Sequence, residues 1–155
     1  MTDPGATIDV EDLREKFLGT VFDECVVTLN PEEIAQYALS CGETAPKFLD
    51  PSDSNFQAPP TIASSFNPKK SYPDGFPKIA GLGMDAGKSV TLEKPIRAGQ
   101  EITLTTSMHD IYTKSGRSGR MVFFVNRTTI TDSQGAALGA SDTSVVIREK
   151  PEESQ

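Results

Sequence analysis

Apolar and polar positions predict helices in the first part of the chain. Asp12–Leu18 places its apolar residues on one side and is followed by Gly19, which predicts a short helix. Val21–Leu29 clusters and alternates apolar residues as a strand does. A helix is then expected over Pro31–Ser40, because the preceding Asn30 suits a cap, proline suits the first helical position, and the acidic residues that follow favour the positive helix end.

Proline and glycine dominate the stretch from residue 43 to residue 87. Proline lacks a backbone donor and interrupts both helices and strand ladders, so we expect this stretch to be mostly irregular. One short helix is expected over Pro60–Phe66, ended by Asn67-Pro68. An irregular stretch of this length is unusual in a compact domain and is typical of a functional segment.

The C-terminal part of the chain predicts strands over residues 89–92, 101–112, 121–131 and 140–148. Short turn-like breaks separate them, and such breaks join neighbouring antiparallel strands, so we expect a meander. Helices followed by strands are typical of an α+β protein. We expect one domain over residues 13–148, with flexible ends at 1–12 and 149–155.

Composition and charge restrict the partners. The net charge of -7 argues against nucleic acid and against an anionic membrane, because both bind basic surfaces. No apolar run is long enough to span a membrane and no signal peptide is recognisable, so we expect a soluble, cytoplasmic protein. Cys25 and Cys41 are then expected to be reduced thiols. A single histidine and two distant cysteines cannot fill a zinc shell, so neither a metal nor another cofactor is predicted.

Three segments of the chain carry distinctive motifs: Gly42–Phe48 (GETAPKF) with Ser54 six positions on, Ala58–Ile62 (APPTI), and Leu92–Gln100 (LEKPIRAGQ). In this order they resemble segments of the MaoC-like (R)-specific enoyl-thioester hydratases, of the N-terminal-domain type. The first resembles the family signature G-D-x-N-P-x-H-x5-[AS] in an altered form, the second resembles its A-P-P-T-[FI] segment, and the third resembles its [RK]-P-[LI]-x-A-G-[DQ] segment. The resemblance extends over residues 24–148, nearly the whole chain.

The resemblance implies a single hot-dog fold, a curled antiparallel sheet around a central helix that is short here. It implies a coenzyme A or carrier-protein acyl thioester as ligand, and a dimer with a paralogous catalytic subunit or with a second copy. In the family, the Asp and His of the signature exchange protons during hydration of an enoyl thioester or the reverse dehydration, without a metal. Glu43 stands at the Asp position and Phe48 at the His position, and phenylalanine cannot exchange a proton. The chain is therefore similar to the substrate-binding subunits of heterodimeric 3-hydroxyacyl-thioester dehydratases.

Two alternatives stay open. Glu43 could act as acid or base in a self-sufficient homodimeric hydratase, although a glutamate just past a helix end is usually solvated. The chain could also be a hot-dog protein that binds a ligand without any reaction. Around the signature, the expected substrate-binding residues are Phe48, Phe56, Pro60, Thr61, Ile62 and Phe66.

The proline-rich stretch also predicts an incompletely filled sheet. Prolines after Phe66 prevent further helical turns, because each proline inside a helix costs about 3 kcal/mol or more. The side chains expected to line the gap are Phe48, Phe56, Ile62, Phe66, Phe76 and Ile79, which would suit a long or ring-bearing acyl group. The alternative is that they fill the space as core.

The remaining candidates are basic residues and the histidine. His109 is expected at the surface, because strand alternation places it opposite Met108. The basic residues could bind coenzyme A phosphates or could simply be solvated; they are Lys69, Lys70, Lys78, Arg117 and Arg120.

Overall fold

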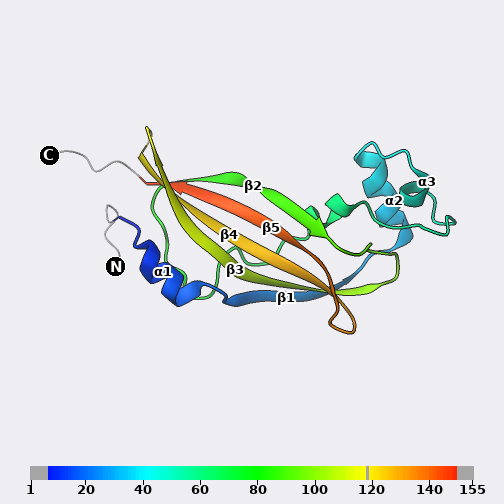
Figure 1. Ribbon diagram of the computed structural model, residues 1–155, viewed down its shortest axis with the longest axis horizontal. Coiled ribbons are helices and arrows are strands. Elements are labelled where there is room, and N and C mark those ends of the chain that lie inside the picture. The colour runs from blue at the N-terminus through cyan, green and yellow to red at the C-terminus, as the bar shows by residue number, and fades with distance from the viewer. Residues whose placement is uncertain (1–6, 118, 150–155) are drawn as a thin grey trace.

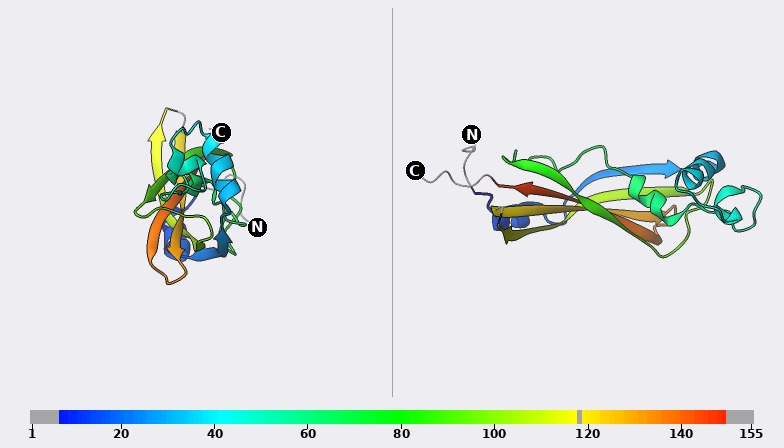
Figure 2. Two further views of the ribbon diagram at one scale, coloured as in Figure 1. Left: turned by 90° about the vertical axis from the view of Figure 1, so that its right-hand side faces the viewer. Right: turned by 90° about the horizontal axis from the view of Figure 1, so that it is seen from above.

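A single five-stranded antiparallel sheet forms the body of the molecule (Figure 1). The computed structural model describes residues 7–117 and 119–149. Its strands are β1 (Val21–Thr28), β2 (Leu82–Leu92), β3 (Glu101–Gly116), β4 (Gly119–Asp132) and β5 (Ala137–Arg148). Its helices are α1 (Val10–Phe17), α2 (Pro31–Ser40), α3 (Pro46–Leu49) and the 3-10 helix η1 (Pro60–Ser65). The strand order is β1-β3-β4-β5-β2, and the views of Figure 2 show how strongly the sheet twists.

The helix α2 begins and ends where the sequence predicted. The Asn30 side chain accepts from the Glu33 backbone N–H at 2.8 Å, and the Glu33 carboxylate accepts from the Asn30 N–H at 2.8 Å. Each side chain thereby satisfies a backbone donor that the first helical turn leaves open. Ile34 and Ala38 are buried. Together with α3, which was not predicted, α2 projects beyond one end of the sheet (Figure 1).

Both ends of the described chain are attached to the sheet. The helix α1 begins at Val10, capped by Asp9, so it includes residues that the sequence assigned to a flexible N-terminus. Glu149, assigned to the flexible tail, accepts from the Ile8 backbone N–H at 2.7 Å and from Arg120 at 2.8 Å. The rest of the two expected flexible ends, residues 1–6 and 150–155, lies outside the described residues.

The sequence prediction was wrong about β2 in two respects. The strand begins at Leu82 rather than at residue 89, and it pairs with β5 rather than with β3, so only β3, β4 and β5 form a meander. Its first half contains Gly83 and Gly87 and is exposed. The register with β5 shifts between Asp85 and Gly87, and glycine inside a strand often marks such a bulge. At the other end, Gly139 of β5 permits a close approach: a Cβ there would lie 2.3 Å from the Thr91 carbonyl oxygen.

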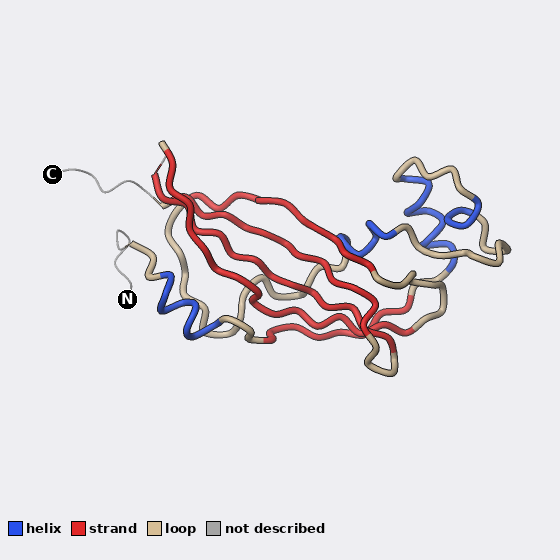
Figure 3. Tube along the Cα trace, in the orientation of Figure 1, coloured by secondary structure: helices blue, strands red, loops and turns tan. Residues whose placement is uncertain are grey.

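Residues 66–81 connect η1 to β2 across one face of the sheet, and we call them the strap (Figure 3). The strap contains no helix or strand, as the prolines predicted. The Lys69 backbone N–H donates to Asp23 at 3.1 Å, and the Asn126 side chain donates to the Ser71 carbonyl at 2.9 Å. These bonds hold the strap against β1 and β4. The covered face is the inner face of the sheet.

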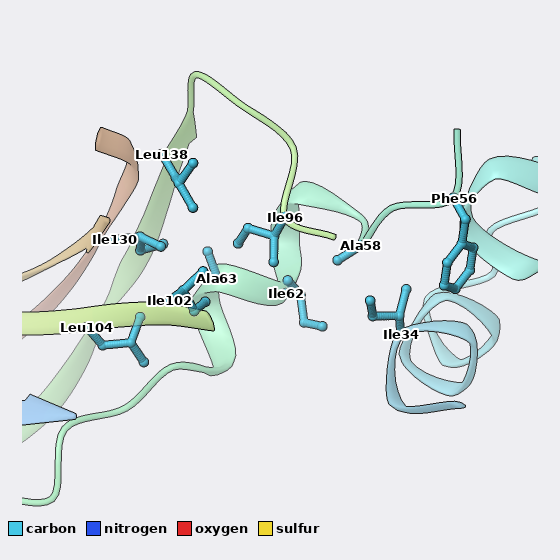
Figure 4. Close-up of a cluster of buried hydrophobic side chains, with 10 residues drawn as sticks. All are labelled: Ile34, Phe56, Ala58, Ile62, Ala63, Ile96, Ile102, Leu104, Ile130 and Leu138. Carbon is cyan, nitrogen blue, oxygen red and sulfur yellow. The ribbon is translucent and has the colours of Figure 1, made fainter. Parts of the chain in front are cut away.

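The buried residues of the inner face form two clusters. The η1 cluster, drawn in Figure 4, consists of Ile34, Phe56, Ala58, Ile62, Ala63, Ile96, Ile102, Leu104, Ile130 and Leu138. The strap cluster consists of Val10, Leu13, Met108, Ile111, Val122, Phe124 and Ile147, and side chains of the strap pack against it. Between them, the buried hydroxyls of Thr106 and Thr128 lie 2.8 Å apart. The sheet therefore has two separate apolar centres with a polar pair between them.

Candidate functional site

The segment 42–48 lies directly after α2. The Glu43 backbone N–H donates to the Ala38 carbonyl at 3.0 Å, which fixes the chain at the helix end. Its carboxylate accepts no hydrogen bond from the described residues, and the residue is partly exposed. Phe48 lies on α3, partly exposed, with the Lys47 ammonium 4.9 Å from its ring centroid. The ring and the ammonium form a cation–π contact, and a phenyl ring transfers no proton.

The single histidine is far from this segment along the sheet. His109 is exposed on β3 and Met108 is fully buried, so the two lie on opposite faces as predicted. The pairing of β3 with β4 shifts between Met108 and Asp110. This bulge lets Ile111 also face inward, and it leaves His109 outside.

The six residues predicted to bind substrate differ in exposure. Phe56 and Ile62 are 8% and 4% exposed and belong to the η1 cluster, and Phe66 packs against it. Figure 4 shows Phe56 beside Ile34 of α2, with Ile62 closer to the sheet. These side chains serve as core at this end of the inner face. Their contact with an acyl group stays a prediction.

Pro60 and Thr61 are exposed on η1, whereas Phe48 is partly exposed on α3. The Tyr37 hydroxyl donates to the Thr61 hydroxyl at 3.1 Å, which connects α2 to η1. The accessible members of the predicted set therefore lie on the two short helices next to α2. Their role in binding also stays a prediction.

A pocket of about 250 Å³ lies over the strap cluster. Its lining residues are Tyr72, Phe76, Pro77, Lys78, Ile79 and Ile147. Phe76 and Ile79 are two of the side chains predicted to line a gap over the sheet. Lys78 was predicted as a possible phosphate-binding residue, whereas Tyr72, Pro77 and Ile147 were not among the predicted site residues. Ile147 was not predicted because it comes from β5, far away in the sequence. The signal that could have found the strap residues is the recurrence of Tyr72, Phe76 and Ile79 every three or four positions between prolines.

One side of this pocket is an aromatic wall. The rings of Tyr72 and Phe76 are stacked, with centroids 4.7 Å apart, and both meet Phe124 of β4 edge to face. The ring of Phe17 in α1 also packs against Phe76, with the two ring centroids 4.9 Å apart. Burial raises the pKa of the Tyr72 hydroxyl. The wall therefore holds the strap to both the sheet and α1.

The remaining basic candidates are partly engaged. Lys70 pairs with Asp74 at 2.9 Å and Arg120 pairs with Glu149 at 2.8 Å, whereas Arg117 is exposed. Cys25 and Cys41 form no disulfide.

Neither a cluster of metal ligands nor a membrane-spanning helix occurs within the described residues. No group of three or more possible ligands for a metal ion occurs there. None of the helices in that part of the chain is long and apolar enough to cross a membrane.

Comparison with known families decides the classification. The family described as FAS1-like, dehydratase domain region, matches residues 16–139. The chain belongs to this family. No curated protein matches the sequence of this dehydratase-domain chain.

Solved structures similar to the dehydratase-domain chain include MaoC-like dehydratases. A MaoC-like dehydratase from Phytophthora capsici has a TM-score of 0.71 at 20% identity, covering 91% of this chain and 50% of its own. The HadBC (3R-hydroxyacyl-ACP dehydratase) complex from Mycobacterium tuberculosis has a TM-score of 0.62 at 16% identity, covering 84% and 97%. The ChsH1-ChsH2 complex from the same organism has a TM-score of 0.64 at 10% identity, and the match covers 93% of this chain and 91% of its own. At these identities they establish the hot-dog fold, as predicted.

Proposed function

We propose that this chain binds the acyl part of a coenzyme A or carrier-protein thioester, in the cytoplasm, and completes the active site of a MaoC-like partner. The partner supplies the Asp/His pair that hydrates the enoyl thioester or dehydrates the 3-hydroxyacyl thioester. The observation that carries this proposal is Phe48 at the family's histidine position. A chain that retains the fold and a pocket but lacks the proton-exchanging pair fits a binding subunit better than an independent enzyme.

The outer edge of β2 is where we propose that the partner pairs. In the described sheet β2 has a neighbour on one side only, and its Leu82 and Met84 are 54% and 39% exposed. An exposed edge strand invites pairing with another chain. Antiparallel pairing with the equivalent strand of a second hot-dog chain would extend the sheet about a two-fold axis. The two mycobacterial neighbours are complexes, which is consistent with such pairing.

This pairing would bring the partner's signature to the pocket. Antiparallel strands run in opposite directions, so the partner's α2 end would lie beside the Leu82 end of β2. The pocket residue Ile147 pairs with Gly83 at that end. The partner's Asp/His pair would then lie near this pocket, while Phe48 stays at the opposite end of the sheet. The loss of a proton-exchanging residue at Phe48 is tolerated in this arrangement.

The predicted binding residues keep a part in the proposal. Phe48, Pro60 and Thr61 are accessible and would contact the thioester or the partner. Phe56, Ile62 and Phe66 would shape that surface from beneath. An apolar pocket orients the acyl group and keeps water from it, which lowers the entropy cost of reaching the partner's reacting groups.

The test is reconstitution with a MaoC-like chain that carries an intact G-D-x-N-P-x-H signature. Hydration of an enoyl-coenzyme A series is followed by loss of the enoyl absorbance. We expect little turnover by this chain alone, turnover by the mixed dimer, and no effect of Glu43→Gln in that dimer. A monomer at micromolar concentration, even with the candidate partner present, would contradict the proposal.

Two outcomes would favour the alternatives. Robust turnover by the lone chain, lost in Glu43→Gln, would indicate a homodimeric hydratase that uses Glu43. Thioester binding without turnover in any combination would indicate a hot-dog binding protein.

A further inference from the structure

The pocket over the strap cluster, which we call the strap pocket, is mainly apolar and has one charged side chain among its lining residues. Its lining residues supply aliphatic and aromatic surface from Phe76, Ile79 and Ile147, among others. Among them Lys78 is the one charged side chain, and the only other polar side chain is Tyr72. Both groups are hydrogen-bond donors, and a lysine ammonium accepts nothing. The side chains thus offer an apolar surface and donors but no carboxylate.

Lys78 is the lysine of the strap that lines the pocket; Lys69 and Lys70 are not among the lining residues. Lys70 is paired with Asp74, whereas the Lys69 ammonium, like that of Lys78, is in no ion pair with a described residue. Lys78 forms no ion pair with any described residue, although the chain as a whole carries a net charge of -7. A cation without a carboxylate partner beside an apolar pocket is suited to an anion or a carbonyl oxygen supplied from outside.

We propose that the strap pocket binds amphipathic ligands, with the apolar part against Phe76, Ile79 and Ile147 and an anionic or carbonyl-bearing group at Lys78. This specifies the ligand of the proposed acyl site and rests on that proposal for the identity of the apolar part. The volume of about 250 Å³ lies slightly below that of drug-sized pockets, so it suits a short chain or one ring.

Two sources can supply the group at Lys78. It is either a carboxylate or keto group at the far end of the acyl chain, or a phosphate of the thioester's carrier. The chemistry at the ammonium is the same in both cases. The contact with Lys78 is removed by changing the end of the acyl chain in the first case and by removing the carrier's phosphate in the second.

The experiment measures binding to the full chain by calorimetry, without a partner. Four thioesters share one short acyl skeleton, which ends in a methyl or a carboxylate group and is carried on coenzyme A or on phosphate-free pantetheine. If the group is on the acyl chain, the carboxylate-ended pantetheine thioester binds more tightly than the methyl-ended one. If it is on the carrier, the coenzyme A thioesters bind more tightly than both pantetheine thioesters.

Either difference in affinity, which we call the contrast, is expected to be about two- to fivefold, the range of an exposed ion pair. It should shrink with added salt. Lys78→Met is expected to remove it and Lys78→Arg to retain it. The matched control is Lys70→Met, which removes a lysine from the same strap outside the pocket and is expected to leave the contrast unchanged. Tyr72→Phe tests the second donor and is expected to reduce the contrast in part.

The outcomes separate this inference from the proposed function. Equal affinities for all four ligands, or a contrast that persists in Lys78→Met, would overturn the inference. Partner-dependent turnover combined with such a result would leave the proposed function standing. Conversely, Lys78-dependent binding without turnover in the mixed dimer would support the inference and count against the proposed function.

Discussion

The two ends of the inner face are covered in different ways. The η1 cluster is packed with mostly aliphatic side chains from α2, η1 and the strands. The backbone of α2 and η1 is hydrogen-bonded within these helices. The strap cluster is covered by α1 and by a segment without regular structure, which attaches through stacked aromatic rings and a few polar contacts. A pocket remains at this second end.

The difference predicts that the two ends differ in local stability. Segments with few backbone hydrogen bonds open at lower free energy than packed helices and strands. The strap is such a segment, so we expect it to open at lower free energy than the η1 cluster. The end that carries the altered signature is therefore the packed end, and the open end lies where a partner along β2 would present its signature.

Phe124→Ala is expected to have the largest effect on the strap end. Phe124 is almost fully buried and supports both rings of the aromatic wall. Truncating a buried phenylalanine costs about 3–5 kcal/mol in the free energy of unfolding. We expect that loss by chemical denaturation, together with faster amide exchange and proteolysis in the strap.

Ile130→Ala is the matched control at the other end. Ile130 is fully buried in the η1 cluster, and its truncation costs about 2–5 kcal/mol. Exchange and proteolysis of the strap should stay as in the wild type once global stability is taken into account. If both variants loosen the strap equally, the two ends are not separate units.

Gly139→Ala tests the close contact between β5 and β2 at the end of the η1 cluster. A Cβ at this position would lie 2.3 Å from the Thr91 carbonyl oxygen and 2.6 Å from the Leu92 side chain, so β2 has to move away from β5. Forced contacts of this kind cost about 1–3 kcal/mol. Gly83→Ala is the control on the same strand pair, because nothing lies within 4 Å of its added Cβ. We expect the denaturation midpoint to fall in Gly139→Ala and to stay near wild type in Gly83→Ala.

Local features of the fold were predictable and remote ones were not. The cap, proline and acids of α2 lie within four residues of one another, so the sequence alone placed that helix. The position of β2 beside β5 depends on contacts between residues that are far apart in the sequence, such as Gly83 and Ile147, which are 64 positions apart. The short connection from Leu92 to Glu101 suggested a hairpin with β3, and no local signal excluded it.

The candidate site divides in the same way. The altered signature was readable because Glu43 and Phe48 occupy fixed positions in a motif. Sequence also indicated an open sheet, because proline prevents a long central helix. It could not separate Phe56 and Ile62, which become core, from Phe76 and Ile79, which line the pocket. All four are apolar residues of one proline-rich stretch, and only packing distinguishes them.

Thr128→Val tests the boundary between the two clusters. The buried Thr128 and Thr106 hydroxyls bond to each other, so removing one leaves the other without this partner. We expect a loss of about 1–3 kcal/mol, the cost of an unsatisfied buried hydroxyl. The double variant Thr106→Val/Thr128→Val should recover most of it, because neither hydroxyl remains. A double-mutant cycle by denaturation measures the coupling, and purely additive losses would show that the pair is not a unit.

Alkaline pH is the mildest way to loosen the strap end. Burial raises the pKa of Tyr72 above its ordinary value of about 10, so the folded chain favours the neutral phenol. The stabilisation is fully present below the unfolded pKa and is lost as pH rises through the folded pKa. The effect is small, because Tyr72 is only partly buried. We expect unfolding stability to fall slightly above pH 10 and then level off, with the strap's amide exchange rising in parallel. Tyr72→Phe removes the ionising group and keeps the ring on Phe76, so an equal fall in this variant would assign the effect to other groups.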